Sequence, residues 1–185
     1  MLIIFCKYNI LEGGDDMSSR YEIREQIEEL TQTMRIRLNL STPLHMIDVI
    51  KKLGINCNPV ENVDYDARLS GNKEEGYCIS YNKTQSFVRQ QFSIAHELGH
   101  LILHTYHRND SQSVYYRRNG SVSQIEWEAN EFAAALLMPR EEFIDFCKEH
   151  VNLEGKIYLS ILAENFKVSE QAVRVRGSVL GLWKA

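Results

Sequence analysis

The sequence lacks any long apolar run, which excludes a membrane-spanning helix. No window reaches the roughly 18 apolar residues that such a helix requires, although 44% of the 185 residues are hydrophobic. The N-terminal stretch MLIIFCKYNI has no basic residues before its apolar run and no small-residue cleavage site after it, so it does not fit a secretory signal. We therefore expect an ordinary soluble, cytoplasmic protein with no membrane partner.

Cysteine and positive charge are also scarce. The chain has 4 cysteines, and no two of them show Cys-x-x-Cys spacing. Without a secretory signal, this predicts reduced thiols and argues against disulfides or a cysteine zinc site. A net charge of -4 argues against general binding to nucleic acid phosphates, which needs a basic surface.

The pattern of apolar residues predicts helices over much of the chain. Residues 18–40 place apolar side chains at spacings of three and four, as an amphipathic helix does; these are Ile23, Ile27, Leu30, Met34 and Leu38. A second helix is expected over 41–54, capped by Ser41 or Thr42, with Pro43 in its first turn and Gly54 as its stop. Further helices are expected over 92–104, over 125–138, where Pro139 ends the helix, and over 140–150.

Between residues 55 and 85 the apolar period shifts toward two, which is typical of strands. Gly71 and Gly76 bracket a predicted turn, and YCISYN (77–82) alternates as a strand does. We expect a small, mainly antiparallel sheet here. The predicted fold class is thus α+β and mostly helical.

The stretch FSIAHELGHLILH (92–104) contains the strongest chemical signal. His96 and His100 are four residues apart, so on a helix they lie about 40° apart on one face and can bind one metal ion. Glu97 lies about 100° from His96, which suits a general base better than a third ligand. Gly99, which has no side chain, lets a neighbouring element approach closely.

A catalytic zinc ion takes three protein ligands and keeps a position for water, so a third ligand is needed. His104 is excluded because it lies about 12 Å from His96 along the helix axis. The following helix, EWEANEFAAALLMP (126–139), offers Glu126 as this ligand, and Asn130 on the same face can orient a neighbouring histidine or carboxylate. Glu128, about 200° round the helix, is expected to face away and is kept as the alternative ligand.

The C-terminal segment LAENFKVSEQAVRVR (162–176) has the pattern of a helix, a turn at Val168 and Ser169, and a second helix capped by Ser169. Helix-turn-helix units look like this, and Arg174 and Arg176 form a small basic patch. The apolar residues of the segment fit packing against the rest of the chain equally well. DNA binding is therefore possible but not favoured.

Taken together, FSIAHELGHLILH, EWEANEFAAALLMP and LAENFKVSEQAVRVRGSVLGL make the chain similar to the ImmA/IrrE family of zinc metallopeptidases over roughly residues 40–185. The resemblance implies a zincin-like fold with a substrate-binding edge strand along the cleft. GYCISYN (76–82) is the best candidate for that strand. The resemblance also implies His96, His100 and Glu126 as zinc ligands and Glu97 as the catalytic base. Tyr115, Tyr116 and His107 are candidates for stabilising the oxyanion.

The resemblance also implies a function, because members of this family typically cleave helix-turn-helix repressors in bacteria or their mobile elements. We therefore expect a zinc-dependent endopeptidase whose partner is such a repressor. The alternative is a regulatory module that binds DNA or a repressor and whose metal site is silent or structural. The expected organisation is an extension of uncertain role (1–16), a metallopeptidase domain (17–150) and a helix-turn-helix-like unit (151–185).

Overall fold

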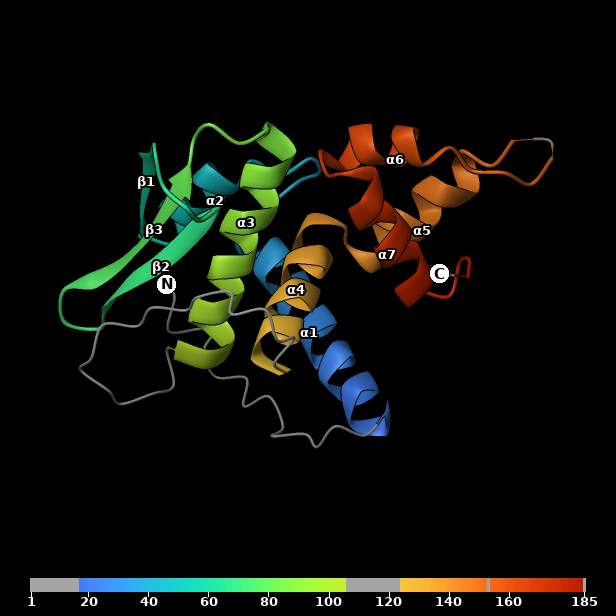
Figure 1. Cartoon of the computed structure of the whole chain (residues 1–185). Helices are drawn as coiled ribbons and strands as arrows, with labels where there is room; N and C mark the ends of the chain where they lie inside the picture. Colours follow the sequence, from blue (N-terminus) through green and yellow to red (C-terminus); the bar gives the residue numbers. More distant parts are fainter. Residues whose placement is uncertain (1–16, 106–123, 153, 185) are drawn as a thin grey trace.

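The computed structural model describes residues 17–105, 124–152 and 154–184, so the N-terminal extension expected over 1–16 lies outside the described residues. The helices are α1 (Met17–Arg37), α2 (Met46–Lys52), α3 (Phe87–Gly99), α4 (Gln124–Leu137), α5 (Arg140–Glu149), α6 (Leu159–Phe166) and α7 (Glu170–Val179), and the π-helical turn η2 (His100–Thr105) continues α3. The strands are β1 (Asn56–Val60), β2 (Ala67–Asn72) and β3 (Gly76–Asn82). The sheet packs on one side of α3, α4 and α1 lie on the other, and α5 to α7 lie beyond them (Figure 1). This is the α+β, mostly helical fold that the sequence predicts.

The sheet is mixed. Its order is β1-β3-β2, with β3 antiparallel to β2 and parallel to β1. Gly71 and Gly76 flank the β2–β3 turn at φ values of 102° and 89°, a region that glycine enters at little cost. The expectation that GYCISYN (76–82) is the edge strand is wrong, because this segment is β3 and pairs on both sides. The edge strand beside α3 is β2.

The first helix forms as the spacing of its apolar residues predicts. All five residues of the predicted stripe are buried in the core, with exposures of 6% or less; they are Ile23, Ile27, Leu30, Met34 and Leu38. The second helix is shorter than expected, because it begins at Met46 and neither Ser41 nor Thr42 caps it. The hydroxyl of Thr42 instead accepts a hydrogen bond from Arg35 and contacts Glu142. The Thr42 hydroxyl, a predicted cap of the helix, is therefore engaged in long-range contacts instead.

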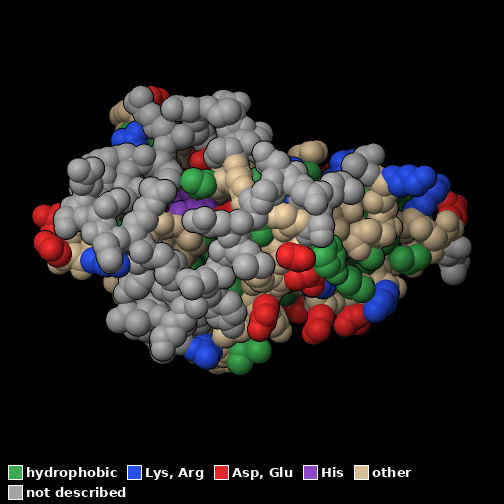
Figure 2. Space-filling view, turned by 90° about the horizontal axis from the view of Figure 1, so that it is seen from below, with side chains coloured by type: hydrophobic (Ala, Val, Ile, Leu, Met, Phe, Trp, Pro, Cys, Tyr) green, Lys and Arg blue, Asp and Glu red, His purple; other side chains and the backbone are tan. Residues whose placement is uncertain are grey.

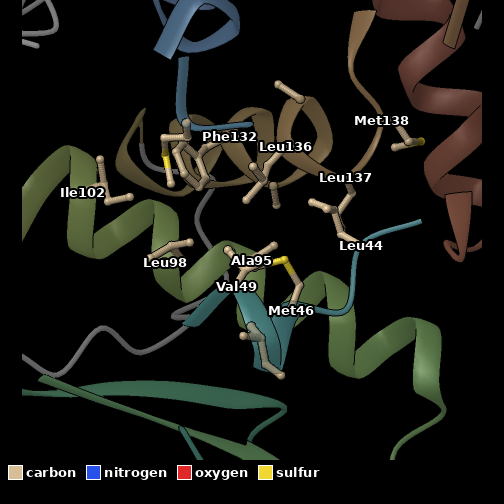
Figure 3. Packing of buried hydrophobic residues seen from close by; sticks show 14 of the residues in the cluster. Leu44, Met46, Val49, Ala95, Leu98, Ile102, Phe132, Leu136, Leu137 and Met138 are labelled. Carbon is tan, nitrogen blue, oxygen red and sulfur yellow. The ribbon is translucent and has the colours of Figure 1, made fainter. Parts of the chain in front are cut away.

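The main hydrophobic core lies where α2, α3 and α4 meet. Figure 3 shows Leu98 and Ala95 of α3 facing Phe132 and Leu136 of α4, with Met46 of α2 closing the same cluster. Each of these side chains is essentially buried, and burying a large apolar side chain stabilises the fold by about 1.5–3 kcal/mol. The core therefore holds α3 and α4 in fixed register.

Arginine–glutamate pairs tie α1 to the C-terminal half of the chain. Arg24 donates two hydrogen bonds to Glu131 of α4, Arg35 bonds Glu142 of α5, and Arg140 of α5 bonds Glu25. Arg176 of α7 donates to both carboxylate oxygens of Glu28. These pairs join α1 to α4, α5 and α7.

None of the helices in the described part of the chain is long and apolar enough to cross a bilayer.

Candidate metal centre

The helix that carries the His-Glu-x-x-His stretch has a buried core face and a polar face, as its sequence predicts. Ile94, Leu98, Leu101 and Ile102 are at most 1% exposed and pack into the core. The helix begins at Phe87, five residues before the predicted start, and its last turn is π-helical over His100–Thr105. π-helical turns inside α-helices occur frequently at functional sites.

Gly99 allows α3 and α4 to approach closely. A Cβ atom at Gly99 would lie 3.1 Å from the Phe132 ring, 3.2 Å from the Cα atom of Ala129 and 3.3 Å from its carbonyl oxygen. These distances are shorter than ordinary carbon contacts of about 3.5–4.0 Å. The absence of a side chain at Gly99 therefore sets the spacing between the two helices that carry the candidate ligands.

Three candidate ligand atoms from these two helices converge at one point. The Nε2 atoms of His96 and His100 are 3.0 Å apart, and each lies 3.3 Å from a carboxylate oxygen of Glu126. In the described part of the chain, these three residues form the group of histidine, cysteine and acidic side chains that could hold a metal ion. Ligands about 2.0–2.2 Å from a tetrahedral ion are separated by about 3.3–3.6 Å. The donor set and its spacing thus fit a zinc-type ion.

Asn130 fixes the orientation of the His96 ring. Its Oδ1 lies 3.0 Å from Nδ1 of His96, and an amide oxygen can only accept, so His96 carries its proton on Nδ1. The lone pair of Nε2 then points toward His100 and Glu126. This is the arrangement expected of a metal-binding histidine, whose second nitrogen donates to an oxygen acceptor.

The side chain of Glu97 points toward the sheet. Its Oε2 accepts a hydrogen bond of 2.9 Å from the backbone amide of Leu69, in the edge strand β2, and the residue is 7% exposed. Leu69 itself is fully buried. The carboxylate is therefore held between the helix that carries the two histidines and the edge of the sheet, where an extended peptide could pair.

Glu128 is placed differently from the sequence-based expectation, whereas His104, which was excluded as a ligand, lies next to the candidate ligand His100. Glu128 does not face away, because it is 7% exposed and its Oε2 lies 2.8 Å from Nε2 of His104. Gln124 donates to the other carboxylate oxygen of Glu128 at 2.9 Å. Nδ1 of His104 lies 3.2 Å from Nδ1 of His100. The spacing of four between His100 and His104 was the sequence signal that could have revealed this contact.

The sequence also named three candidates for stabilising the oxyanion and a basic residue, Arg176. Tyr115, Tyr116 and His107, the candidates for stabilising the oxyanion, lie outside the described residues. Arg176 is 1% exposed and bonded to Glu28 and to the carbonyl of Met138, so its guanidinium is not available to nucleic acid.

The C-terminal unit has the local form that the sequence predicts. Lys167 takes the left-handed conformation with φ 53°, and the hydroxyl of Ser169 accepts from the amide of Ala172 to cap α7. Its side chains are divided between the core and solvent, since Val173 is buried and Val175 is 52% exposed. Helix, turn and helix are thus present, but the buried side of α7 packs against the body of the protein.

Comparisons with known proteins agree with this arrangement. Residues 50–178 match the Peptidase_M78 family, described as the IrrE N-terminal-like domain. A solved structure described as a Mycobacterium tuberculosis transcriptional regulator is similar with a TM-score of 0.61 and 17% identity, over 83% of this chain and 46% of that one. The chain therefore spans less than half of that protein, and the likeness concerns the fold. No curated protein sequence matches this chain significantly. The matched segment contains all three converging residues and Glu97, and the chain belongs to the Peptidase_M78 (IrrE N-terminal-like) family, whose members have a metallopeptidase-like or regulatory role.

Proposed function

We propose that this chain is a zinc-dependent endopeptidase that hydrolyses a peptide bond in a protein substrate. The observation that carries the proposal is the convergence of His96, His100 and Glu126, with ligand atoms 3.0–3.3 Å apart. Two imidazoles and one carboxylate are a donor set used by catalytic zinc sites in peptidases. A zinc ion bound there would act as a Lewis acid on the scissile carbonyl and lower the pKa of a water molecule.

Glu97 is the proposed general base. Its carboxylate would accept a proton from the attacking water and later deliver that proton to the leaving amine, so the peptide bond breaks without a covalent intermediate. General acid–base catalysis of this kind contributes typically about 10² to 10⁴ in rate. The amide of Leu69 donates a hydrogen bond of 2.9 Å to the carboxylate, which helps to hold it ready for proton transfer.

The edge strand β2 is the proposed docking line for substrate. An extended peptide that adds to a sheet edge gains main-chain hydrogen bonds, and Leu69 of this strand contacts the proposed base directly. We further propose, on the basis of the family resemblance, that the substrate is a helix-turn-helix repressor. The domain division at residue 150 is likewise a proposal.

Replacement of Glu97 by glutamine tests the proposal. Purified parent protein should bind one zinc ion and cleave a helix-turn-helix repressor, beginning with any such repressor that is encoded beside its own gene. The E97Q variant should bind zinc equally and lose about 10² to 10⁴ in cleavage rate. Glu154→Gln is the matched control, because the Glu154 side chain is 70% exposed and pairs with Lys156. Fragments identified by mass spectrometry give the readout.

Two results would contradict the proposal. One is parent protein without stoichiometric zinc, and the other is cleavage by E97Q at the parent rate. DNA binding is the competing function, and a steep fall in affinity with rising salt would reveal it in a mobility-shift assay.

A further inference from the structure

We infer that His104 and Glu128 are positioning residues that determine which nitrogen of His100 is presented to the metal. This inference rests on the proposed function, since it concerns a ligand of the same centre. It assigns a role to two buried polar side chains that neither the ligand set nor the proposed base uses.

A continuous chain of hydrogen bonds connects α4 to the centre through these side chains. Gln124 donates to Glu128 Oε1 at 2.9 Å, Glu128 Oε2 lies 2.8 Å from His104 Nε2, and His104 Nδ1 lies 3.2 Å from His100 Nδ1. The side chains of His104 and Glu128 are 8% and 9% exposed, and His100 is 1% exposed. Bulk water therefore competes little for these hydrogen bonds.

The position of each proton follows from the acceptor at the end of the chain. An ionised carboxylate only accepts hydrogen bonds, so Glu128 requires a proton on Nε2 of His104. A neutral imidazole carries one proton, which leaves a lone pair on Nδ1 of His104. That lone pair accepts from Nδ1–H of His100. Nε2 of His100 is then unprotonated and faces His96 and Glu126, as a ligand must.

The two candidate histidine ligands are thus oriented by different means. His96 donates directly to the amide oxygen of Asn130, whereas His100 donates to a second histidine that is itself fixed by a carboxylate. Metal-binding histidines usually donate to a carboxylate, a backbone carbonyl or water, and loss of that partner typically lowers metal affinity 10–100-fold. An intervening histidine extends the reach of Glu128 to a ligand that it does not touch.

The contact between His100 and His104 lies within the π-helical turn. It starts at His100 and includes His104, and Thr105 Oγ1 donates to the carbonyl of His100 at 3.1 Å. The ring centroids of His100 and His104 are 5.4 Å apart. The turn therefore holds the two imidazoles next to each other, and the contact of His104 with Glu128 places this pair on the side that faces α4.

Two substitutions of His104 separate a positioning role from simple space filling. His104→Leu keeps the apolar bulk but removes the acceptor for His100. His104→Asn keeps an acceptor, because its Oδ1 occupies the place of the imidazole Nδ1. Zinc affinity is measured by competition with a chromophoric chelator for the parent and both variants. We expect a 10–100-fold loss for H104L and a loss within about threefold for H104N.

A spectroscopic measurement on the parent protein adds a readout that does not depend on variants. Ring nitrogen chemical shifts of the zinc-loaded protein should show His104 as the neutral tautomer protonated on Nε2. Protonation on Nδ1, or equal zinc affinities of parent and H104L, would overturn the inference. A parent that binds no zinc would instead overturn the proposed function, so the two failures are distinguishable. Should H104L fail to fold, the tautomer and H104N still decide the question.

Discussion

Replacing Arg176 by methionine should destabilise the fold strongly, because this buried arginine joins three parts of the chain. Its Nε donates to the carbonyl of Met138 at 3.0 Å, and its two terminal nitrogens donate to Glu28 at 2.5 and 3.0 Å. Methionine fills most of the volume but leaves the Glu28 carboxylate, 11% exposed, without this partner. Arg140 lies 3.8 Å from the same carboxylate and compensates only in part.

The expected loss in the free energy of unfolding is about 3–5 kcal/mol, the usual cost of removing one partner from a buried ion pair. This is a large fraction of the roughly 5–15 kcal/mol that stabilises a typical folded domain. The assay is urea unfolding of the metal-free protein, followed by circular dichroism. The double variant with Glu28→Gln should recover part of the loss, because it no longer buries an unpaired charge.

A loss of less than about 1 kcal/mol for R176M, the value typical of exposed pairs, would refute this reasoning. It would also reopen a role for this guanidinium in contacting a nucleic acid. Arg174, whose side chain is exposed on the same helix, provides the matched control. Arg174→Met should change the free energy of unfolding by no more than about 0.5 kcal/mol.

Three further substitutions or treatments test other parts of the description. Gly99→Ala gains about 1 kcal/mol of helix propensity. It should nevertheless destabilise the protein overall and weaken zinc binding, because the new Cβ atom would lie 3.2 Å from the Cα atom of Ala129 and the backbone of α4 cannot move aside there. Calorimetry measures the stability, and chelator competition measures the zinc affinity. Burial raises the pKa of the Cys147 thiol from 9.0 to about 11, so its thiolate fraction at pH 8 is about a hundredfold smaller than that of an ordinary cysteine. Cys147 should therefore stay unalkylated by iodoacetamide until the chain unfolds, and peptide mapping measures this. The hydrogen bond from Arg140 holds the pKa of Glu25 below its usual value of 4.5, so the stability that Glu25 contributes should be complete above about pH 4.5 and disappear as the pH falls through its folded-state pKa. Because this side chain is more than a third exposed, the difference between parent and Glu25→Gln should stay under about 1 kcal/mol at pH 6, and a difference that grows toward low pH would contradict it.

The sequence predicts those parts of the fold and of the centre that depend on spacing within one helix. The buried stripe of α1 follows from its period. The proximity of His96 and His100 follows from their separation by four residues, and the choice of Glu126 follows from its shared face with Asn130. Each of these expectations needs only the geometry of a regular helix. The metal-binding role of these residues stays a prediction.

Expectations that depended on distant parts of the chain were less successful. The start of α2 was predicted too early because Glu142, in another helix, contacts the hydroxyl of Thr42. The order of the strands depends on where β1 is inserted, which no local pattern reveals, so the central strand was mistaken for the edge. Glu128 was expected to point away from Glu126, but its carboxylate contacts His104 of another helical segment, and spacing within one helix does not reveal such a contact.

The hydrogen bond between Leu69 and Glu97 has a consequence for selectivity. The edge strand β2 and the Glu97 carboxylate meet at the backbone amide of Leu69, so a segment that paired along that strand would lie close to the proposed base. A segment that shifts the strand would shift the acid with it. Main-chain pairing and readiness for proton transfer would then rise or fall together, so a poorly aligned segment would be both weakly bound and slowly cut.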